Sequence, residues 1–332
     1  MSPAGAAGPA ALLPGLALAG ALAALAFGIR AAFPEWAPGA LMLAIVLGAA
    51  WRNLRGVPAA AGPGIAACLR RPLRIGIVLL GLQLTLAQLL AITPAGVALL
   101  VACVVLTFGF TLAIGRLLGV DAGLSMLIAA GTSICGASAA VAMNAVVRDR
   151  SESVAYALGV VTLFGTVAML GFPLVGALAG MTDQAYGVWI GASVHEVAQV
   201  VAAAFALGDE AGQYGMASKL ARVLMLAPMV LLLGLVLARR AGGGASAVPV
   251  PWFAFGFVAM VCVASADILP DAARVALAWL SQALLAVALV AVGLETDLRS
   301  LRAQGWRPLA LGAAATVFIG TLAFALVGLV YD

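Results

Sequence analysis

Charged residues are scarce in this sequence. Asp, Glu, Lys and Arg make up 9% of its 332 residues, whereas 65% are hydrophobic; in an average soluble domain about a quarter of the residues are charged. Apolar runs of about 20 residues recur from end to end, and no soluble fold could bury them all. The runs are continuous rather than alternating, which excludes an outer-membrane barrel. The composition predicts an all-α polytopic membrane protein, with residues 1–332 forming a single domain in the lipid bilayer.

Histidine and cysteine are scarce too. The chain has one histidine, and its four cysteines lie far apart, without the spacing of a disulfide framework or a metal site. We therefore expect no metal and no cofactor. The sequence also lacks a nucleotide-binding loop and a pair of catalytic carboxylates in a polar segment, so we expect no enzyme activity. Its net charge of +4 comes from basic residues clustered in particular loops, which indicates membrane topology rather than nucleic-acid binding.

Hydropathy predicts about eleven membrane spans. They cover residues 11–29, 38–51, 73–91, 95–115, 122–146, 153–179, 185–207, 216–238, 252–268, 272–296 and 308–330. A cytoplasmic N-terminus and a periplasmic C-terminus place most of the arginines on the inner side, as the positive-inside rule requires. The loop that holds Arg148 and Arg150 argues weakly the other way.

One stretch in the middle of the fifth span is unlike the rest. Residues 131–140 read GTSICGASAA, ten small and uncharged residues. They suit a membrane helix that breaks, because a break aims free backbone N–H groups and a helix-dipole end at a ligand. With no carboxylate in the stretch, we expect the gap to attract an anion. Close packing of small residues is the alternative, but it does not account for the polar side chains. The candidate ligand residues are Thr132, Ser133, Cys135, Gly136 and Ser138.

A second polar segment, GASVHEVAQVV, covers residues 191–201. Interpreted as one continuous helix, it presents His195 and Gln199 to the ligand side, while Ser193 and Glu196 share another face and Glu196 meets a neighbouring helix. His195 is a candidate proton carrier, since an unperturbed imidazole titrates near pH ~6.5. The alternative is that His195 is a satisfied polar group within a helix bundle.

Further charges lie in or beside the apolar runs, where each one requires a reason. Lys219 and Arg222 share one helix face, and they either neutralise Glu196 or supply positive potential for an anion. Glu295 and Asp297 end the tenth span. They are either coupling carboxylates or interfacial groups paired with the arginines of the following loop.

Several strings, in this order and over nearly the whole chain, resemble the YeiH-type family of bacterial inner-membrane proteins, which are described as sulfate exporters. The strings are GTSICGASAA, VTLFGTVAML, GASVHEVAQVVAA, KLARVLMLAP and GLETDLRSL. The family looks like a distant relative of the bile-acid symporters and cation/proton antiporters. The resemblance implies the bacterial inner membrane, a homodimer and an elevator-type movement of a core against a scaffold. It also implies two inverted five-helix repeats, residues 38–179 and 185–330, with crossing helices broken in spans 5 and 10 and with span 1 as an addition.

The leading hypothesis is a secondary transporter of a small anion, sulfate or a related sulfonate or carboxylate, coupled to H⁺ or Na⁺. One alternative is a cation/proton antiporter that uses Glu196, Glu295 or Asp297. The wider group carries acidic residues at the helix crossing where this chain has Thr132 and Ser133, which argues against simple sodium/proton exchange. Another alternative is a membrane sensor or an inactive transporter fold.

Overall fold

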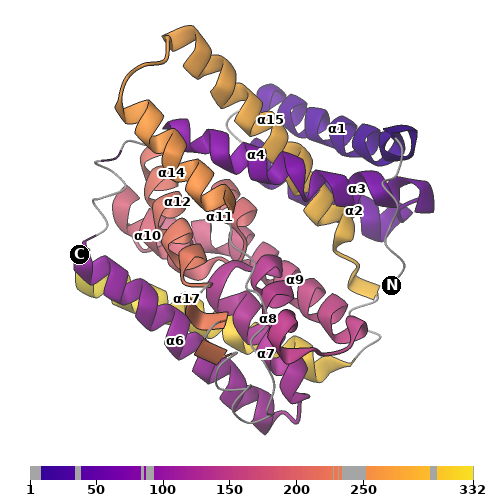
Figure 1. Cartoon of the computed structure of the whole chain (residues 1–332), viewed down its shortest axis with the longest axis vertical. Helices are drawn as coiled ribbons and strands as arrows, with labels where there is room; N and C mark the ends of the chain where they lie inside the picture. The colour runs from indigo at the N-terminus through magenta and orange to yellow at the C-terminus, as the bar shows by residue number, and fades with distance from the viewer. Residues whose placement is uncertain are drawn as a thin grey trace. The chain divides into compact units, whose positions relative to one another are not determined.

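The computed structural model describes residues 9–33, 39–83, 86, 93–226, 228–230, 232–233, 252–299 and 305–331. Helices account for most of them, and no strand occurs within these ranges. Figure 1 shows the helices in chain order. Among the described residues, five helices are long and apolar enough to cross a membrane: Ala10–Ala32, Pro94–Leu117, Glu152–Leu178, Asp271–Glu295 and Trp306–Val330. The prediction of an all-α membrane protein is confirmed.

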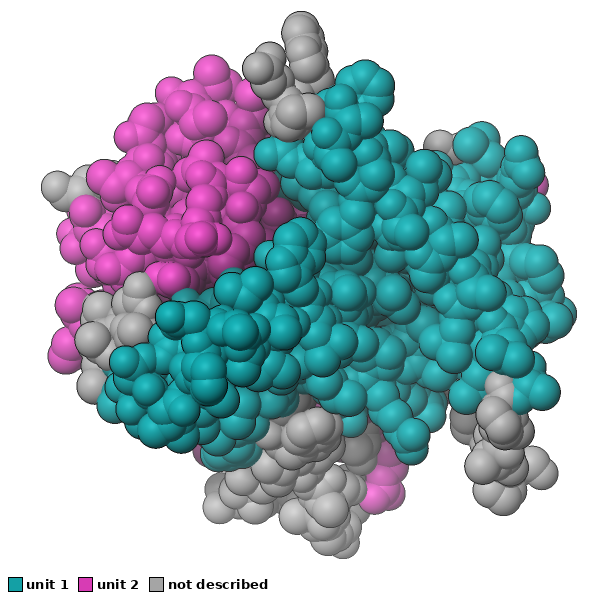
Figure 2. Space-filling model, turned by 90° about the horizontal axis from the view of Figure 1, so that it is seen from above, with its two compact units in different colours: residues 1–86, 255–298 teal, residues 87–254, 299–332 magenta. Residues whose placement is uncertain are grey.

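The helices form two compact units, coloured separately in Figure 2. Unit 1 comprises residues 1–86 and 255–298, and unit 2 comprises residues 87–254 and 299–332. The helices of unit 1 are α1 (Pro9–Ala32), α2 (Ala40–Arg55), α3 (Gly62–Cys68), α4 (Arg71–Leu80), most of α14 (Trp252–Ser265) and α15 (Asp271–Glu295), with short 3₁₀ turns η1 (Ala59–Ala61) and η2 (Gly81–Gln83).

Unit 1 is built around α15, which packs along α2 and α4. Gly48 and Gly293 let α2 and α15 approach backbone to backbone, since a Cβ at either position would collide with the main chain of the other helix. At one end of this pair, Arg52 forms an ion pair with Asp297 at 3.0 Å. Asn53 donates to the carbonyl of Thr296 at 2.8 Å. Unit 1 is therefore a close-packed helical bundle with an ion pair near the end of α15.

Unit 2 has three long helices and two helical hairpins. The long helices are α6 (Pro94–Leu117), α9 (Ser151–Leu178) and α17 (Trp306–Val330). The first hairpin comprises α7 (Ala122–Ala130), the π-helical turn η3 (Gly131–Cys135) and α8 (Ala137–Val147). The second hairpin comprises α10 (Asp183–Ser193) and α11 (Val197–Ala204), and α12 (Asp209–Leu224) packs along both of its arms.

The first hairpin returns to the end of unit 2 from which it enters. Its arms α7 and α8 pack against each other, and the Asp149 carboxylate, just after α8, lies against Gly123 at the start of α7. The prediction of a crossing span over residues 122–146 is therefore wrong, although the predicted break within it is confirmed. The chain turns back because Gly136, at φ 74° and ψ −137°, adopts a backbone conformation that only glycine tolerates well.

The second hairpin enters from the opposite end and also turns back. The Tyr186 hydroxyl on α10 donates to the carbonyl of Ala203 on α11 at 3.0 Å, which places the two ends of the hairpin side by side. The predicted crossing span over residues 185–207 is therefore wrong as well, and so is the continuous helix over residues 191–201. Val194 and Glu196 are extended, and a new helix begins at Val197.

The predicted break in the tenth span is absent. α15 runs without interruption over Asp271–Glu295, because its sequence there is dominated by Ala, Leu and Val, which sustain a helix, and contains no glycine before Gly293. The two breaks of unit 2 thus belong to re-entrant hairpins rather than to crossing helices.

Candidate functional site

The first tip, Gly131–Gly136, is a π-helical turn. Gly136 N donates to Gly131 O at 2.8 Å, which closes the wide turn. Neither position has room for a larger residue than glycine. A Cβ on Gly131 would press on Val161 of α9, and one on Gly136 would collide with the Cγ of Glu196. The tip is enclosed, with Thr132 and Ser133 almost fully buried, and no side chain caps the start of α8.

The second tip, Val194–Glu196, caps itself. Glu196 is the N-cap of α11: its side chain accepts from the backbone N–H of Gln199, while the Gln199 side chain accepts from Glu196 N at 3.1 Å. The Gln199 amide also donates to Thr162 O and to the hydroxyl of Thr166 on α9. A reciprocal cap followed by an apolar helix is the reason why the chain breaks here.

Two cations from α12 join the tips. Lys219 donates to Ile134 O of the first tip at 2.9 Å and to Val194 O of the second tip at 2.8 Å. Arg222 donates to Ser133 O at 2.7 Å and to Gly191 O, near the end of α10, at 2.9 Å. It also reaches Thr132 O at 3.1 Å and Val194 O at 3.3 Å. The cations thus satisfy carbonyls that helix ends leave without partners, at the negative ends of two helix dipoles.

Lys219 and Arg222 are both 0% exposed. Burying a charge inside a bilayer costs several kcal/mol unless it is paired or solvated, and here backbone carbonyls supply the solvation. Within the described ranges, the ion pairs do not include either cation. Their hydrogen bonds go to carbonyl dipoles, and the neutralisation of Glu196 by these cations stays a prediction.

Glu196 nevertheless lies at the meeting point of the two tips. Its side chain packs against Gly136, and the hydroxyl of Thr162 on α9 donates to its Oε1 at 2.8 Å. It is 9% exposed. Glu196 therefore meets a neighbouring helix, α9, as predicted, and it also packs against the first hairpin. Residues 131–140 contain no carboxylate of their own, but the second hairpin places one beside them.

His195 is fixed by a hydrogen bond to α17. Its Nε2 lies 3.0 Å from Thr316 Oγ1, whose single proton is donated to Gly312 O at 2.7 Å. Nε2 must therefore carry the ring proton, and Nδ1 is the unprotonated nitrogen. Nδ1 is buried and has no hydrogen-bond partner among the described residues. The prediction that His195 and Gln199 share one face fails, because Gln199 turns toward α9.

The remaining predicted side chains differ in accessibility. Ser138 is exposed, and its hydroxyl lies 3.1 Å from the buried Cys135 thiol. Ser133 Oγ is buried without a partner in the part of the chain that is described. Ser193 Oγ donates to Trp189 O one turn earlier, at 2.6 Å, so its role is within its own helix. Glu295 and Asp297 belong to unit 1, whereas both tips belong to unit 2.

Sequence reasoning missed three threonines that contact the second tip, Thr162 and Thr166 on α9 and Thr316 on α17. Their signal was a hydroxyl within an otherwise apolar run, which is common in membrane helices. The second break had a clearer signal: Ser193-x-x-Glu196 and Glu196-x-x-Gln199 both follow the spacing of a capping box before an apolar run.

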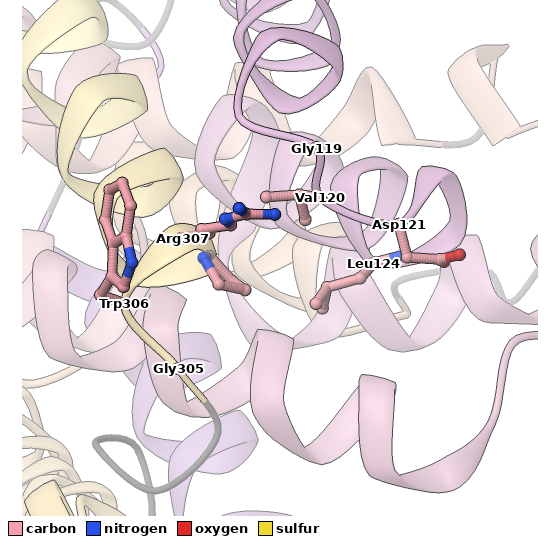
Figure 3. Close-up of a pocket in the computed structure, with 8 residues that line it drawn as sticks. Gly119, Val120, Asp121, Leu124, Gly305, Trp306 and Arg307 are labelled. Atoms are coloured by element: carbon pink, nitrogen blue, oxygen red, sulfur yellow. The ribbon is translucent and has the colours of Figure 1, made fainter.

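A pocket of about 310 Å³ lies at the base of the first hairpin, away from its tip (Figure 3). Its lining includes Asp121, Leu124, Trp306 and Arg307. Asp121 is the N-cap of α7, accepting from Gly123 N at 2.9 Å. The pocket therefore marks the junction of the hairpin with the start of α17, and it contains no residue of either tip.

No group of His, Cys, Asp and Glu suited to a metal occurs among the residues that the structure places. The donors that face the tips are an ammonium, a guanidinium and hydroxyls, and the acceptors are one carboxylate and backbone carbonyls. Such a set suits charged or hydrogen-bonding small solutes. Broken helices whose ends meet inside a bundle are typical of secondary transporters.

Comparison with known proteins agrees with these features. The family described as Conserved hypothetical protein 698 matches residues 14–312. The UPF0324 membrane protein PA5383 of Pseudomonas aeruginosa is 40% identical over 320 residues, which cover 91% of this chain and 90% of that protein. The UPF0324 membrane protein TauZ of Paracoccus denitrificans is 37% identical over 297 residues, 87% of each chain. The UPF0324 membrane protein Atu0671 of Agrobacterium fabrum is 36% identical over 325 residues, 95% of this chain and 92% of that one. The chain therefore belongs to the UPF0324 family of membrane proteins, which confirms the resemblance to the YeiH-type family.

Proposed function

We propose that this protein is a secondary transporter that binds a small anion at the two hairpin tips. One observation carries the proposal: Lys219 and Arg222 bring two positive charges to the meeting point of two re-entrant hairpins, against the single negative charge of Glu196. The field at the tips favours an anion by one net charge. Re-entrant helices entering from opposite ends supply what alternating access requires, a site reached from either side.

The anion class is sulfate or a related sulfonate or carboxylate. The exposed Ser138 hydroxyl lies at the edge of the first tip, where it can exchange its long bond to Cys135 O, 3.3 Å, for one to an oxyanion. The uncapped first turn of α8 begins at the same place. We assign the transport step to an elevator-type movement of unit 2 against unit 1, in a homodimer in the bacterial inner membrane.

The re-entrant hairpin also strengthens the proposed topology, with the N-terminus cytoplasmic. Because the first hairpin returns to its entry end, Arg148 and Arg150 join Arg116 and Arg307 on the inner side. The loop that holds Arg148 and Arg150, which in a crossing-span topology argued against a cytoplasmic N-terminus, thus supports it. Arg30 and Arg274 remain as the basic residues of outer loops.

A second candidate, a cation/proton antiporter, is favoured by the position of the Glu196 carboxylate between the tips.

Transport assays with the purified protein in liposomes distinguish the two candidates. We expect labelled sulfate, sulfonate or carboxylate to move down its gradient, with outward movement from an inside-negative vesicle assisted by about 2.3 kcal/mol per charge per 100 mV. If no anion moves but a Na⁺ or K⁺ pulse moves protons, the antiporter replaces the proposal. If nothing moves under either condition, the sensor or inactive fold replaces it.

A matched pair of variants tests whether the anion binds at the tips. Ser138→Ala removes the exposed hydroxyl of the first tip, and we expect at least a tenfold loss of anion affinity, since a hydrogen bond to a charged group contributes about 1.5–3 kcal/mol. Thr321→Ala, on α17, is the control, because that exposed hydroxyl donates to Val317 O in its own helix. Equal affinities in the two variants would place the anion elsewhere.

A further inference from the structure

The titratable groups that face the two tips differ in their burial and in their hydrogen-bond partners. Glu196 lies at the second tip and is 9% exposed, with one oxygen accepting from the Thr162 hydroxyl at 2.8 Å. Its side chain lies against Gly136, next to the exposed Ser138. The carboxylate therefore occupies the place where the anion of the proposed function would meet the start of α8.

The neighbouring groups are unsuited to exchanging a proton with the transported solution. His195, on the same tip, is 0% exposed, and its proton is fixed at Nε2 by Thr316 of α17. Lys219 and Arg222 of α12 face the tips as cations and add to the cost of a third positive charge on the imidazole. From the first hairpin the facing group is the buried Cys135 thiol.

α9 and α17 present the hydroxyls of Thr162, Thr166 and Thr316 to the second tip. Among the described titratable groups that contact the tips, Glu196 is thus the carboxyl, and it is less deeply buried than His195, Lys219, Arg222 or Cys135. Its two states also differ in what they offer an anion. As a carboxylate it repels the anion and fills the position beside Gly136; as a neutral carboxylic acid it leaves the charge of both cations uncompensated and gains an O–H donor.

We propose that Glu196 is the coupling site of the transporter: it takes up one proton with each anion bound and releases it when the anion leaves. The inference rests on the proposed function. In the step, a proton from solution adds to a carboxylate oxygen, no other bond changes, and the Thr162 hydroxyl rotates or retains its bond to the other oxygen. A monovalent anion then moves without net charge, and a divalent anion moves with one negative charge.

The protonation itself can be tested without any anion. Infrared difference spectra of the protein in liposomes, recorded between alkaline and acidic solution, report the C=O band of a protonated carboxyl. We expect a band that is lost in Glu196→Gln and retained in Glu295→Gln, a matched change at the end of α15 in unit 1. Retention of every carboxyl band in Glu196→Gln would overturn the inference, whether or not anions are transported.

The coupling is tested by the pH dependence of flux. We expect anion uptake by wild type to rise as the external pH falls and to carry protons with it, detected by a pH-sensitive dye inside the vesicle. In Glu196→Gln we expect anion uptake to lose its dependence on external pH, and we expect no proton movement to accompany the anion. Proton movement that persists in Glu196→Gln would overturn the inference while leaving anion transport intact. A Glu196 band without flux of any anion would refute the proposed function but not the proton site.

Discussion

The two hairpin tips reach the same place by different means. The first is made of small residues with no side-chain cap, turns at a glycine with φ 74°, and has its carbonyls satisfied by side chains of another helix. The second has an ordinary extended backbone at Val194 and Glu196 and caps its own helix through Glu196 and Gln199. One tip is held from outside, whereas the other is largely held by its own sequence.

This difference indicates which tip depends on the position of α12. A turn that depends on α12 loses its satisfied carbonyls whenever α12 shifts, because small side chains offer no local replacement. The second tip keeps the hydrogen bonds of its cap, between Glu196 and Gln199, as it moves, although the Val194 carbonyl also accepts from α12. This tip carries the titratable group, Glu196. We therefore expect the first tip to order and disorder with α12, and the second to move as a rigid piece with Glu196.

Removal of the Arg222 guanidinium should have the largest effect, because it leaves carbonyls of both hairpins without donors. We expect Arg222→Met to lower the free energy of unfolding by about 3–5 kcal/mol, the range for breaking a buried charged interaction. Thermal unfolding of the protein in detergent micelles measures this. Arg222→Lys should recover part of the loss, since an ammonium has donors but not the planar fork. Equal stability of wild type and Arg222→Met would mean that the first tip does not depend on α12.

The sequence allowed much of the scaffold and part of the site to be predicted. Long apolar runs located the helices because a bilayer imposes length and hydrophobicity directly. The break at residues 131–140 was predictable from its composition. The re-entrant turns were not, since a run of about 20 apolar residues fits both a crossing helix and two shorter arms. The partners of Lys219 were equally hidden: Ile134 and Val194 accept through carbonyls that every residue has, so no side chain marks them.

Gly136 distinguishes the tips by backbone geometry. Gly136→Ala should cost about 3 kcal/mol, from the positive φ and from the collision of the new Cβ with Glu196 Cγ. Thermal unfolding again reports the loss. Gly171→Ala, on α9 where nothing lies within 4 Å of the added Cβ, is the matched control and should be neutral or stabilising. Combining Gly136→Ala with Glu196→Ala removes the collision, so the two costs should fall short of additivity by about 1 kcal/mol. Strict additivity would show that the tips do not touch.

The smallest effect is expected at the self-capped tip. Gln199→Ala removes one side of the reciprocal cap and the amide bonds to Thr162 and Thr166, yet Glu196 still accepts from the backbone N–H at position 199. We expect a loss of about 1–2 kcal/mol in unfolding free energy, as for other N-cap changes. Gln282→Ala on α15 is the control for a Gln→Ala change in the same fold. Amide hydrogen exchange should quicken at Glu196 and Val197 while residues 131–136 keep their protection, because Lys219 and Arg222 still hold the first tip. If protection is lost at both tips together, the second tip is not self-supporting and the two hairpins form one cooperative unit.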